Sequence, residues 1–409
     1  MEKRTNETKV IVFTNNKGGV GKTSSCTSIG ALLSLLGYKC LVVDNDFQAN
    51  TTATFLEDES EKQRKTICDL YQLQTYSRDT VSECITATPY ANLDLIPSSP
   101  ELKNMDVYLY SQMGKRVVQK ILAKALKAVK SDYDYVLIDT HPDANLVAQN
   151  ALCCSDYVLT PVQASGYSVQ GLVPLVNDIL AISQDEDLNP NLKFLGMFLV
   201  NVNIGTRNYK QYKDFCQETF NDDYIPIAVR NDASIEAVST WLIPLPYLLG
   251  SRDYKSSSRW KGIYDYIEFM HDVNMIDDVD YLIGMATFYT LEGRLHIAYK
   301  NHEIVQFRVD PKLIDTQNET EDLTPDEKEQ DINQEEVQEM SDYSNSTYLT
   351  LAQIVETLNV NDGLRNEVKD LLPKVAYETR VLRRYVMNST AKSERRSYIR
   401  ISSLKEEAK

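Results

Sequence analysis

A stretch near the start of the chain, NNKGGVGKTS, combines three glycines, two lysines and two hydroxyl side chains. In a phosphate-binding loop of the pattern G-x-x-x-x-G-K-[ST], backbone N–H groups surround the phosphates, the lysine reaches their oxygens, and the hydroxyl binds Mg²⁺. Gly21, Lys22 and Thr23 fit this pattern, but Asn16 stands where the first glycine belongs, and a second lysine, Lys17, follows it. The stretch therefore predicts a site for a nucleoside phosphate and raises the question of what the extra lysine does.

Acidic residues follow two other apolar runs. The run ending V-V-D-N-D-F-Q supplies Asp44, Asp46 and Gln48, and the run Y-V-L-I-D supplies Asp139. A carboxylate after four apolar residues is typical of a Walker B motif, in which it binds Mg²⁺ or a water on the ion. We therefore expect Asp139 to lie opposite the hydroxyl of Thr23.

These residues need a scaffold, and the apolar pattern predicts one. The runs KVIVF, KCLVVD, DYVLID, DYVLTPV and GMFLVNV alternate with helix-period stretches such as SSCTSIGALLSLLG and KRVVQKILAKALKAVKS. Strands that are apolar on both faces and separated by helices favour an α/β fold, with a mostly parallel twisted sheet flanked by helices on both faces. In such sheets ligands bind at the carboxyl ends of the strands, where the motifs above lie.

The pattern changes along the chain, so we divide it into four predicted parts. Residues 1–280 form the nucleotide-binding domain with the sheet. Residues 281–311 form a β-rich extension with a turn at Glu292-Gly293, and residues 312–347 form an acidic linker with too little apolar area to fold. Residues 348–409 form a helical segment with a basic tail, which together with the β-rich part makes a C-terminal α+β extension.

Composition limits the cellular context. The net charge of −16 is uneven, with −11 between Asp315 and Asp342 and +6 between Arg380 and Lys409, so the overall charge is a poor guide to partners. The seven cysteines form no C-x-x-C pair, no apolar signal segment opens the chain, and no apolar run approaches the ~18 residues of a membrane span. These features predict a reduced, cytoplasmic protein with no transmembrane segment.

Four ordered motifs together resemble the ParA/MinD class of P-loop ATPases, and in particular the ParA group that partitions plasmids and chromosomes. The deviant Walker A pattern K-G-G-x-G-K-T of that family matches Lys17–Thr23, and its switch pattern D-x-D-x-Q matches Asp44–Gln48. Its D-x-P-P pattern matches Asp139–Pro142, with His141 in place of the first proline. Its P-V-Q…G-L element matches Pro161–Leu172, and the likeness covers about two-thirds of the chain.

The resemblance implies a slow Mg²⁺-dependent ATPase that closes as a homodimer around ATP. Three residues would be catalytic: Lys17 would reach the phosphates of the partner subunit, Lys22 would bind phosphate in its own subunit, and Asp46 would position the attacking water. The residues expected to bind ATP are Gly18, Gly19, Val20, Gly21, Lys22, Thr23, Ser24, Asp44 and Asn231. The residues expected to bind Mg²⁺ are Thr23, Asp46 and Asp139.

The resemblance also implies binding of nonspecific DNA, a ParB-like centromere-binding partner that stimulates hydrolysis, and association with the nucleoid. Arg207 matches the place of a DNA-contacting basic residue in the family. Arg230 lies in a partly kept P-R-N-x-R-x-x-E-A element that lacks the proline and the second arginine. Lys255 and Arg259, in YKSSSRWKG, extend the predicted basic stripe, although a solvated helix end explains them equally well.

Simpler interpretations remain open for single residues. Lys17 also fits a solvated loop lysine, and either Asp44 or Asp46 fits the N-cap of a helix. His141 is better explained as a loop histidine than as a catalytic one, because phosphoryl transfer needs no imidazole. Cys153-Cys154 fits a buried apolar pair rather than a metal site.

Alternatives for the whole protein also remain. The basic tail fits a DNA-binding arm, a membrane-surface helix, or a helix packed on its own domain. The rival functions are a MinD-like positioning ATPase that binds membrane, a DNA-binding regulator with little ATPase activity, and a P-loop ligase or synthetase of small-molecule metabolism.

Overall fold

The computed structural model describes residues 7–56, 64–113, 117–164, 172–248, 261–278, 280–281, 284–285 and 288. The chain divides into two compact units, Met1–Val273 with Arg294–Asp315, and Asn274–Gly293 with Thr316–Lys409. Every strand and helix named below belongs to the first unit, which carries all the described motifs.

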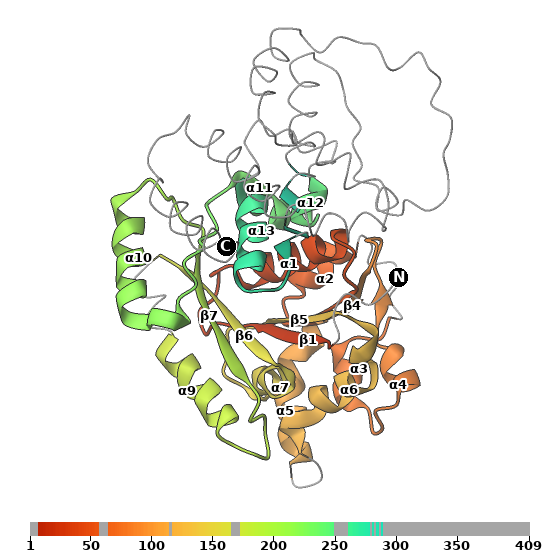
Figure 1. Ribbon diagram of the computed structural model, residues 1–409. Helices are drawn as coiled ribbons and strands as arrows, with labels where there is room; N and C mark the ends of the chain where they lie inside the picture. The colour runs from red at the N-terminus through yellow and green to blue at the C-terminus, as the bar shows by residue number, and fades with distance from the viewer. Residues whose placement is uncertain are drawn as a thin grey trace, which may run out of the picture. The chain divides into compact units, whose positions relative to one another are not determined.

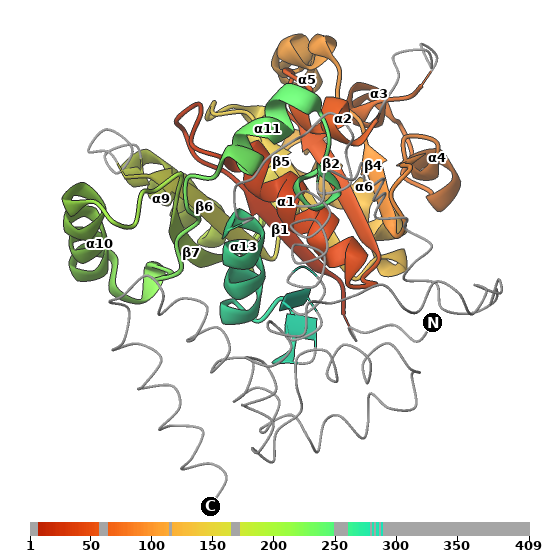
Figure 2. The same cartoon turned by 90° about the horizontal axis from the view of Figure 1, so that it is seen from above.

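A seven-stranded sheet forms the centre of this unit (Figure 1). Its order is β3-β4-β2-β5-β1-β6-β7, and only the short edge strand β3 runs antiparallel to its neighbour. Figure 2 shows β4 and β7 toward opposite sides of the sheet. The mostly parallel α/β fold is thus confirmed, and the strand bounds are β1 Lys9–Phe13, β2 Cys40–Asn45, β3 Thr86–Ala87, β4 Leu93–Ile96, β5 Tyr135–Thr140, β6 Tyr157–Gln163 and β7 Lys193–Val200.

Helices cover both faces of the sheet, and α10 (Arg207–Phe220) lies beside β7 (Figure 1). One face carries α1 Lys22–Leu35, α2 Asn50–Phe55, α11 Ala233–Trp241, α12 Leu245–Leu248 and α13 Lys261–Asp272. The other carries α3 Ile67–Gln72, α4 Arg78–Ser82, α5 Met105–Gln112, α6 Ile121–Val129, α7 Leu146–Cys154 and α9 Leu172–Ser183. Short 3₁₀ turns occur at Pro100–Asn104, Val118–Lys120, Lys130–Asp132 and Asn221–Asp223.

Burial follows the hydrophobic pattern. Every residue of β2 and β5 is buried, as expected for central parallel strands covered on both faces. Helix α6 buries one stripe at helical spacing and exposes its lysines. The stripe belongs to the large core cluster and consists of Ile121, Leu122, Ala125, Leu126 and Val129. The apolar periodicity therefore supplies the packing that holds the strand ends in place.

The first β-α-β unit explains why distant motifs meet. Strand β1 does not pair with β2, because β5 lies between them. In the parallel register Asp139 on β5 stands beside Phe13 on β1 and beside Asp44 on β2. The loop after β1 and the two carboxylates therefore lie together at the carboxyl ends of the central strands.

Two features differ from the sequence-based expectations. The pattern did not indicate β3 or β4, which have two and four residues. Strands were expected from about Ala286 onward, and Phe288, the one residue of that stretch that the structure describes, is helical. The remainder of the predicted 281–311 extension, the acidic linker and the basic tail lie outside the described residues. Among the described residues no helix has the length and apolar character needed to span a membrane.

Candidate nucleotide site

The loop between β1 and α1 has the backbone shape of an anion site. Gly19 and Gly21 adopt φ values of +71° and +86°, a backbone conformation that residues with a Cβ rarely adopt. A Cβ on Gly21 would also lie 3.0 Å from Cγ2 of Val200. Helix α1 follows at once with no side-chain cap and no acidic residue in its first turn, so its first N–H groups remain for an anionic ligand.

Lys22 lies inside this loop and is only 6% exposed. Its Nζ donates to the backbone oxygens of Asn15 (3.2 Å) and Lys17 (3.1 Å). Burial lowers the pKa of Lys22, while the carboxylates of Asp139, Asp46 and Asp143 act in the opposite direction. Its ammonium is thus held at the loop by neutral carbonyl groups, which phosphate oxygens can replace.

Lys17 and Asn15 shape the entrance to the loop. The buried Asn15 donates through Nδ2 to the Pro161 oxygen (2.9 Å) and accepts at Oδ1 from the Lys17 backbone N–H (3.0 Å). Lys17 itself is half-buried, and the neighbouring Gly18 is exposed. Asn15 therefore fixes the backbone from which the extra lysine extends.

Asp139 forms the centre of the predicted metal site. Its Oδ2 accepts from the hydroxyls of Thr23 (2.7 Å) and Thr51 (2.8 Å). Its Oδ1 is buried and has no hydrogen-bond partner among the described residues. A buried oxygen without a donor is costly unless a ligand completes it, so this carboxylate and the Thr23 hydroxyl fit a hard cation.

The described residues contain no group of three or more His, Cys, Asp or Glu side chains placed to hold a metal ion. Mg²⁺ at nucleotide sites does not need such a cage, because it keeps several waters and takes one or two protein oxygens together with phosphate oxygens. The donor set at Asp139 and Thr23 is of this kind.

Asp44 has a structural partner that the sequence did not indicate. Its Oδ2 accepts from both the backbone N–H (2.7 Å) and the hydroxyl (2.6 Å) of Thr52, and its Oδ1 accepts from the Asp46 N–H (3.2 Å). Thr52 lies in the first turn of α2, whose own N-cap residue, Ala49, provides no side-chain bond. Asp44 therefore caps α2 from outside the helix, in line with the capping alternative.

Asp44 and Asp139 are neighbours in a dry environment. Both are fully buried, and they stand side by side across β2 and β5. Burial raises the pKa of each carboxyl group, and the charge of Asp139 adds to the rise for Asp44. The two carboxyls therefore hold protons more tightly than ordinary aspartates in the absence of a cation.

Asp46 directly follows β2, at the same carboxyl ends of the strands, and is buried. Its Oδ1 accepts from the Gln48 N–H (2.9 Å) and lies 2.8 Å from Nδ1 of His141. The first bond closes a tight turn within the switch segment, and the second joins that segment to the loop after β5. Sequence reasoning treated His141 as a loop histidine and did not foresee this contact.

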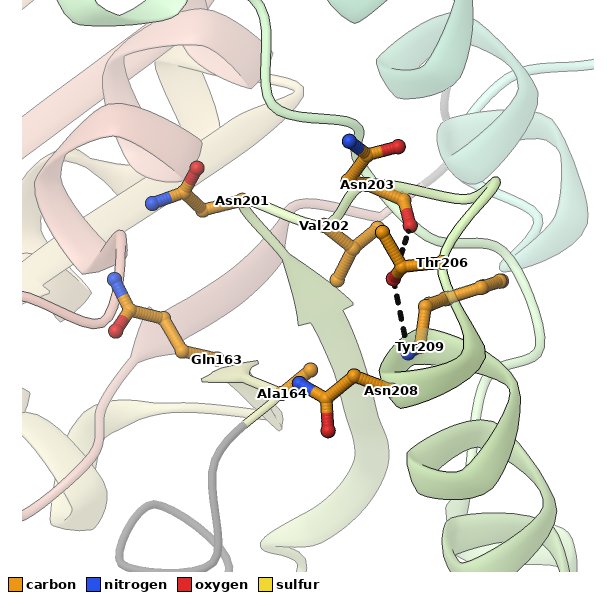
Figure 3. A pocket seen from close by; sticks show the side chains of 8 residues that line it. All are labelled: Gln163, Ala164, Asn201, Val202, Asn203, Thr206, Asn208 and Tyr209. Carbon is orange, nitrogen blue, oxygen red and sulfur yellow. Dashed lines mark hydrogen bonds between the residues drawn. The ribbon is translucent and has the colours of Figure 1, made fainter.

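A pocket of about 320 Å³ opens beside the loop, between the ends of β6 and β7 and the start of α10. Figure 3 shows the amide side chains of Gln163 and Asn201 on one side of it and Asn208 on the other. Gln163, from the P-V-Q element, donates through Nε2 to the Gly19 oxygen (2.8 Å). This motif thus supports the phosphate loop; its residues 165–171 lie outside the described part of the chain.

The residues predicted to contact DNA lie in different settings. Arg207 is exposed at the start of α10, where Thr206 caps the helix by accepting from the Tyr209 N–H (3.2 Å; Figure 3). Arg230 instead forms a two-pronged pair with Asp265 of α13, with Nε to Oδ2 at 2.7 Å and the terminal nitrogen to Oδ1 at 2.5 Å. Lys255 and Arg259 lie outside the described residues.

The Arg230 pair has a clear physical basis. Asp265 is 4% exposed, and burial raises its pKa while the Arg230 guanidinium opposes the rise. A buried carboxylate needs such a partner, so the guanidinium has a structural role in joining the β7–α11 segment to α13. The adjacent Asn231, a predicted nucleotide contact, is exposed, and its N–H donates to the Val202 oxygen (2.8 Å).

The site therefore assembles residues that sequence reasoning named and others that it missed. Asp46, Asp139 and the loop from Lys17 to Ser24, including the buried Val20, come together at one edge of the sheet. The missed residues are Asn15, Thr51, Thr52 and His141. Thr51 and Thr52 lie three and four positions after the switch segment Asp44–Gln48, and this pair of hydroxyl residues was the signal available in the sequence.

Comparison with known proteins agrees with this geometry. A family model described as an AAA domain matches residues 8–194. The sporulation initiation inhibitor protein Soj of Bacillus subtilis is 33% identical over 226 residues, covering 54% of this chain and 85% of Soj. The chromosome partitioning protein ParA of Caulobacter vibrioides is 30% identical over 260 residues, covering 62% of this chain and 94% of that protein.

The chain belongs to the ParA family of partitioning ATPases. The ATP complex of a Cyanothece McdA variant covers 67% of this ParA-family chain and is itself covered to 99%, with a TM-score of 0.55 and 21% identity. Cobyrinic acid a,c-diamide synthase of Mycobacterium smegmatis with bound ADP and magnesium covers 57%, is covered to 91%, and has a TM-score of 0.51 and 24% identity. At these identities the two structures support the fold alone.

Proposed function

We propose that this ParA-family chain is a Mg²⁺-dependent ATPase that dimerises on ATP, binds nonspecific DNA, and segregates a plasmid or chromosome. A centromere-binding protein of the ParB type would stimulate its slow hydrolysis. The main support is the arrangement at Asp139, where a buried carboxylate oxygen without a hydrogen-bond partner among the described residues lies beside the Thr23 hydroxyl and the uncapped start of α1.

ATP binding uses residues already at the phosphate loop. The first N–H groups of α1 bind the phosphates, and Lys22 exchanges its two carbonyl partners for phosphate oxygens. Thr23 and Asp139 would hold Mg²⁺, which would neutralise charge on the phosphates. A bound cation also favours the ionised form of both buried carboxyls, Asp139 and Asp44.

Hydrolysis uses Asp46 and Lys17. Asp46 orients the attacking water. An oriented carboxylate suffices, because the protein catalyses phosphoryl transfer mainly by positioning the reactants and stabilising charge. Lys17 extends from the loop toward the partner subunit and stabilises the charge on the transferred phosphoryl group. Supplying this cation from the partner makes hydrolysis depend on dimerisation.

The segment Asp44–Gln48 is the element that reports the nucleotide state. At one end Asp44 is bonded to the first turn of α2, and in the middle Asp46 closes a turn with Gln48. Contacts with the γ-phosphate and its Mg²⁺ would favour one arrangement of this segment, and loss of the phosphate would release it. The dimer surface is thereby coupled to hydrolysis.

For DNA, the described residues favour α10 over the Arg230 region. Arg207 and Lys210 are both exposed on the first turn of this helix, three residues apart. Contacts from such side chains to DNA phosphates are independent of sequence and weaken with salt.

The proposal is tested by sedimentation of the full-length protein with Mg²⁺ and a non-hydrolysable ATP analogue, in the presence and absence of duplex DNA. We expect a monomer–dimer shift that requires both Mg²⁺ and the analogue, and DNA binding by the dimer only. A protein that stays monomeric at all attainable concentrations would contradict it. Co-sedimentation with anionic liposomes in place of DNA would instead support a MinD-like activity.

A further inference from the structure

His141 occupies the position where the family motif D-x-P-P has its first proline. Its ring lies between two carboxylates, with Nδ1 2.8 Å from Asp46 Oδ1 and Nε2 3.5 Å from Asp143 Oδ2. The distance to Asp46 is that of a hydrogen bond, and the distance to Asp143 is longer than that. The ring is therefore hydrogen-bonded to Asp46 and not to Asp143.

The direction of this bond follows from the chemistry of its partners. An ionised carboxylate only accepts hydrogen bonds. Nδ1 of the imidazole must therefore carry a hydrogen and donate a hydrogen bond to Asp46. The ring also packs on Phe47, with centroids 4.1 Å apart and planes at 42°. Two adjacent switch residues therefore fix the imidazole, one by a bond and one by packing.

The effect on Asp46 is to fix its carboxylate from two sides. The Gln48 N–H comes from within the switch segment, and His141 Nδ1 comes from the loop after β5, 95 residues away in the sequence. Both donors reach the same oxygen, Oδ1, so rotation of the carboxylate would break both bonds. A proline at position 141 has no donor and could not form the second bond.

We propose that His141 is a positioning residue that holds the Asp46 carboxylate in its water-orienting position and ties the switch segment to the Walker B loop. This inference rests on the proposed function, in which Asp46 orients the water. In this chain His141 thus gives the switch segment a hydrogen bond that the proline of the family motif cannot form. Its effect is on the chemical step rather than on nucleotide affinity, because His141 acts through Asp46.

The test compares the full-length protein with the variants His141→Ala, His141→Asn and Asp143→Asn. The side-chain amide of asparagine can place a donor near the position of Nδ1, whereas alanine places none. Asp143→Asn is the matched control, since it alters the neighbour that makes no hydrogen bond at Nε2. Steady-state ATP turnover gives kcat and KM, and a fluorescent ATP analogue gives the dissociation constant.

We expect His141→Ala to lower kcat about tenfold or more, as for loss of one hydrogen bond to a charged group, with KM and nucleotide affinity changed less than about twofold. His141→Asn should recover most of the loss, and Asp143→Asn should lower kcat far less than His141→Ala does. A rise in KM with unchanged kcat, or an asparagine variant as slow as alanine, would overturn the proposal.

A second measurement does not depend on turnover. In the nucleotide-free protein, hydrogen exchange of the Gln48 amide reports whether Asp46 stays in place. We expect faster exchange in His141→Ala and wild-type exchange in His141→Asn, with thermal melting confirming that the variants are folded. Unchanged exchange in His141→Ala would refute the positioning role even if the protein hydrolysed no ATP.

The Asp46→Ala background separates failure of this inference from failure of the proposed function. If Asp46→Ala lowers turnover and His141→Ala adds nothing further to it, the histidine acts through Asp46. If Asp46→Ala turns over ATP like the wild type, the proposed role of Asp46 fails. If Asp46→Ala is slow but His141→Ala alone is not, only the role of His141 fails.

Discussion

Lys22 in the phosphate loop and Arg230 beside α13 were both predicted to bind phosphate, ATP in one case and DNA in the other. The side chains hold very different partners. Lys22 donates to two neutral backbone oxygens, whereas Arg230 neutralises the buried carboxylate of Asp265. A cation held by carbonyl groups can exchange them for phosphate, but one that compensates a buried charge cannot leave without exposing that charge to an apolar environment.

The largest expected effect that sharpens this contrast is on stability. Arg230→Ala leaves the Asp265 carboxylate buried without its partner, so the free energy of unfolding should fall by about 3 kcal/mol or more. Arg207→Ala, which removes an exposed arginine, should change it by less than about 0.5 kcal/mol. Urea denaturation measures both, and equal stability of the two variants would show that the Arg230 pair does not stabilise the fold.

The next effect is on nucleotide affinity. Lys22→Met keeps the aliphatic volume and removes the charge, so ATP binding should weaken about a hundredfold. The free energy of unfolding should stay level or rise, because a buried charge has been removed. Isothermal titration and urea denaturation of the same sample test the two parts. If Lys22→Met were unfolded, Lys22 would be needed for stability, as Arg230 is. If it bound ATP like the wild type, Lys22 would not be a phosphate-binding residue.

A different kind of effect concerns pH. Because burial raises the pKa of Asp44 and Asp139, the folded state keeps protons that the unfolded chain releases. Their contribution to stability is complete below about pH 4 and is lost as the pH rises, by at most about 1.4 kcal/mol per pH unit for each group. We expect the nucleotide-free protein to become less stable from about pH 5 to pH 8.

The comparison with variants isolates these groups from other titrating residues. Asp44→Asn should reduce the slope of unfolding free energy against pH, whereas Asp143→Asn, with its exposed side chain, should leave it unchanged. Thermal or chemical denaturation across the pH series provides the data. An Asp44→Asn slope equal to that of the wild type would contradict a raised pKa at Asp44.

The smallest effect is on DNA. Arg207→Ala should weaken nonspecific DNA binding by the ATP-bound dimer only a few-fold and reduce the slope of log affinity against log salt by about 1. Fluorescence anisotropy at several salt concentrations measures this, with Glu218→Ala on the same helix as the control. A salt slope that Arg207→Ala leaves unchanged would place the DNA surface elsewhere.

The same contrast explains how much the sequence could predict. The phosphate loop, β1, β2 and β5 follow from short-range patterns, because apolar runs, glycines and a helix start are all local. The parallel order of β2 and β5 then places Asp44 next to Asp139. Residues that act within one such motif were therefore recognised before the structure was described.

The distant partners of Arg230 and Asp46 were not recognised. Arg230 and Asp265 are 35 positions apart, and His141 and Asp46 are 95 apart, so no local pattern links either pair. The capping of α2 by Asp44 was foreseen only as an alternative for that residue, and its donor, Thr52, was not named. Strand β4 was missed because its four residues include an aspartate and form too short a run.

The most direct test of the account mixes two inactive proteins. Lys17→Ala lacks the lysine that would act on the partner subunit, and Asp46→Ala lacks the water-orienting carboxylate. In a mixed dimer the intact Lys17 of one subunit faces the intact Asp46 site of the other, so equal amounts should regain about a quarter of wild-type ATP turnover by random pairing. A mixture that stays as inactive as its components, although sedimentation shows ATP-dependent mixed dimers, would contradict a lysine acting across the dimer.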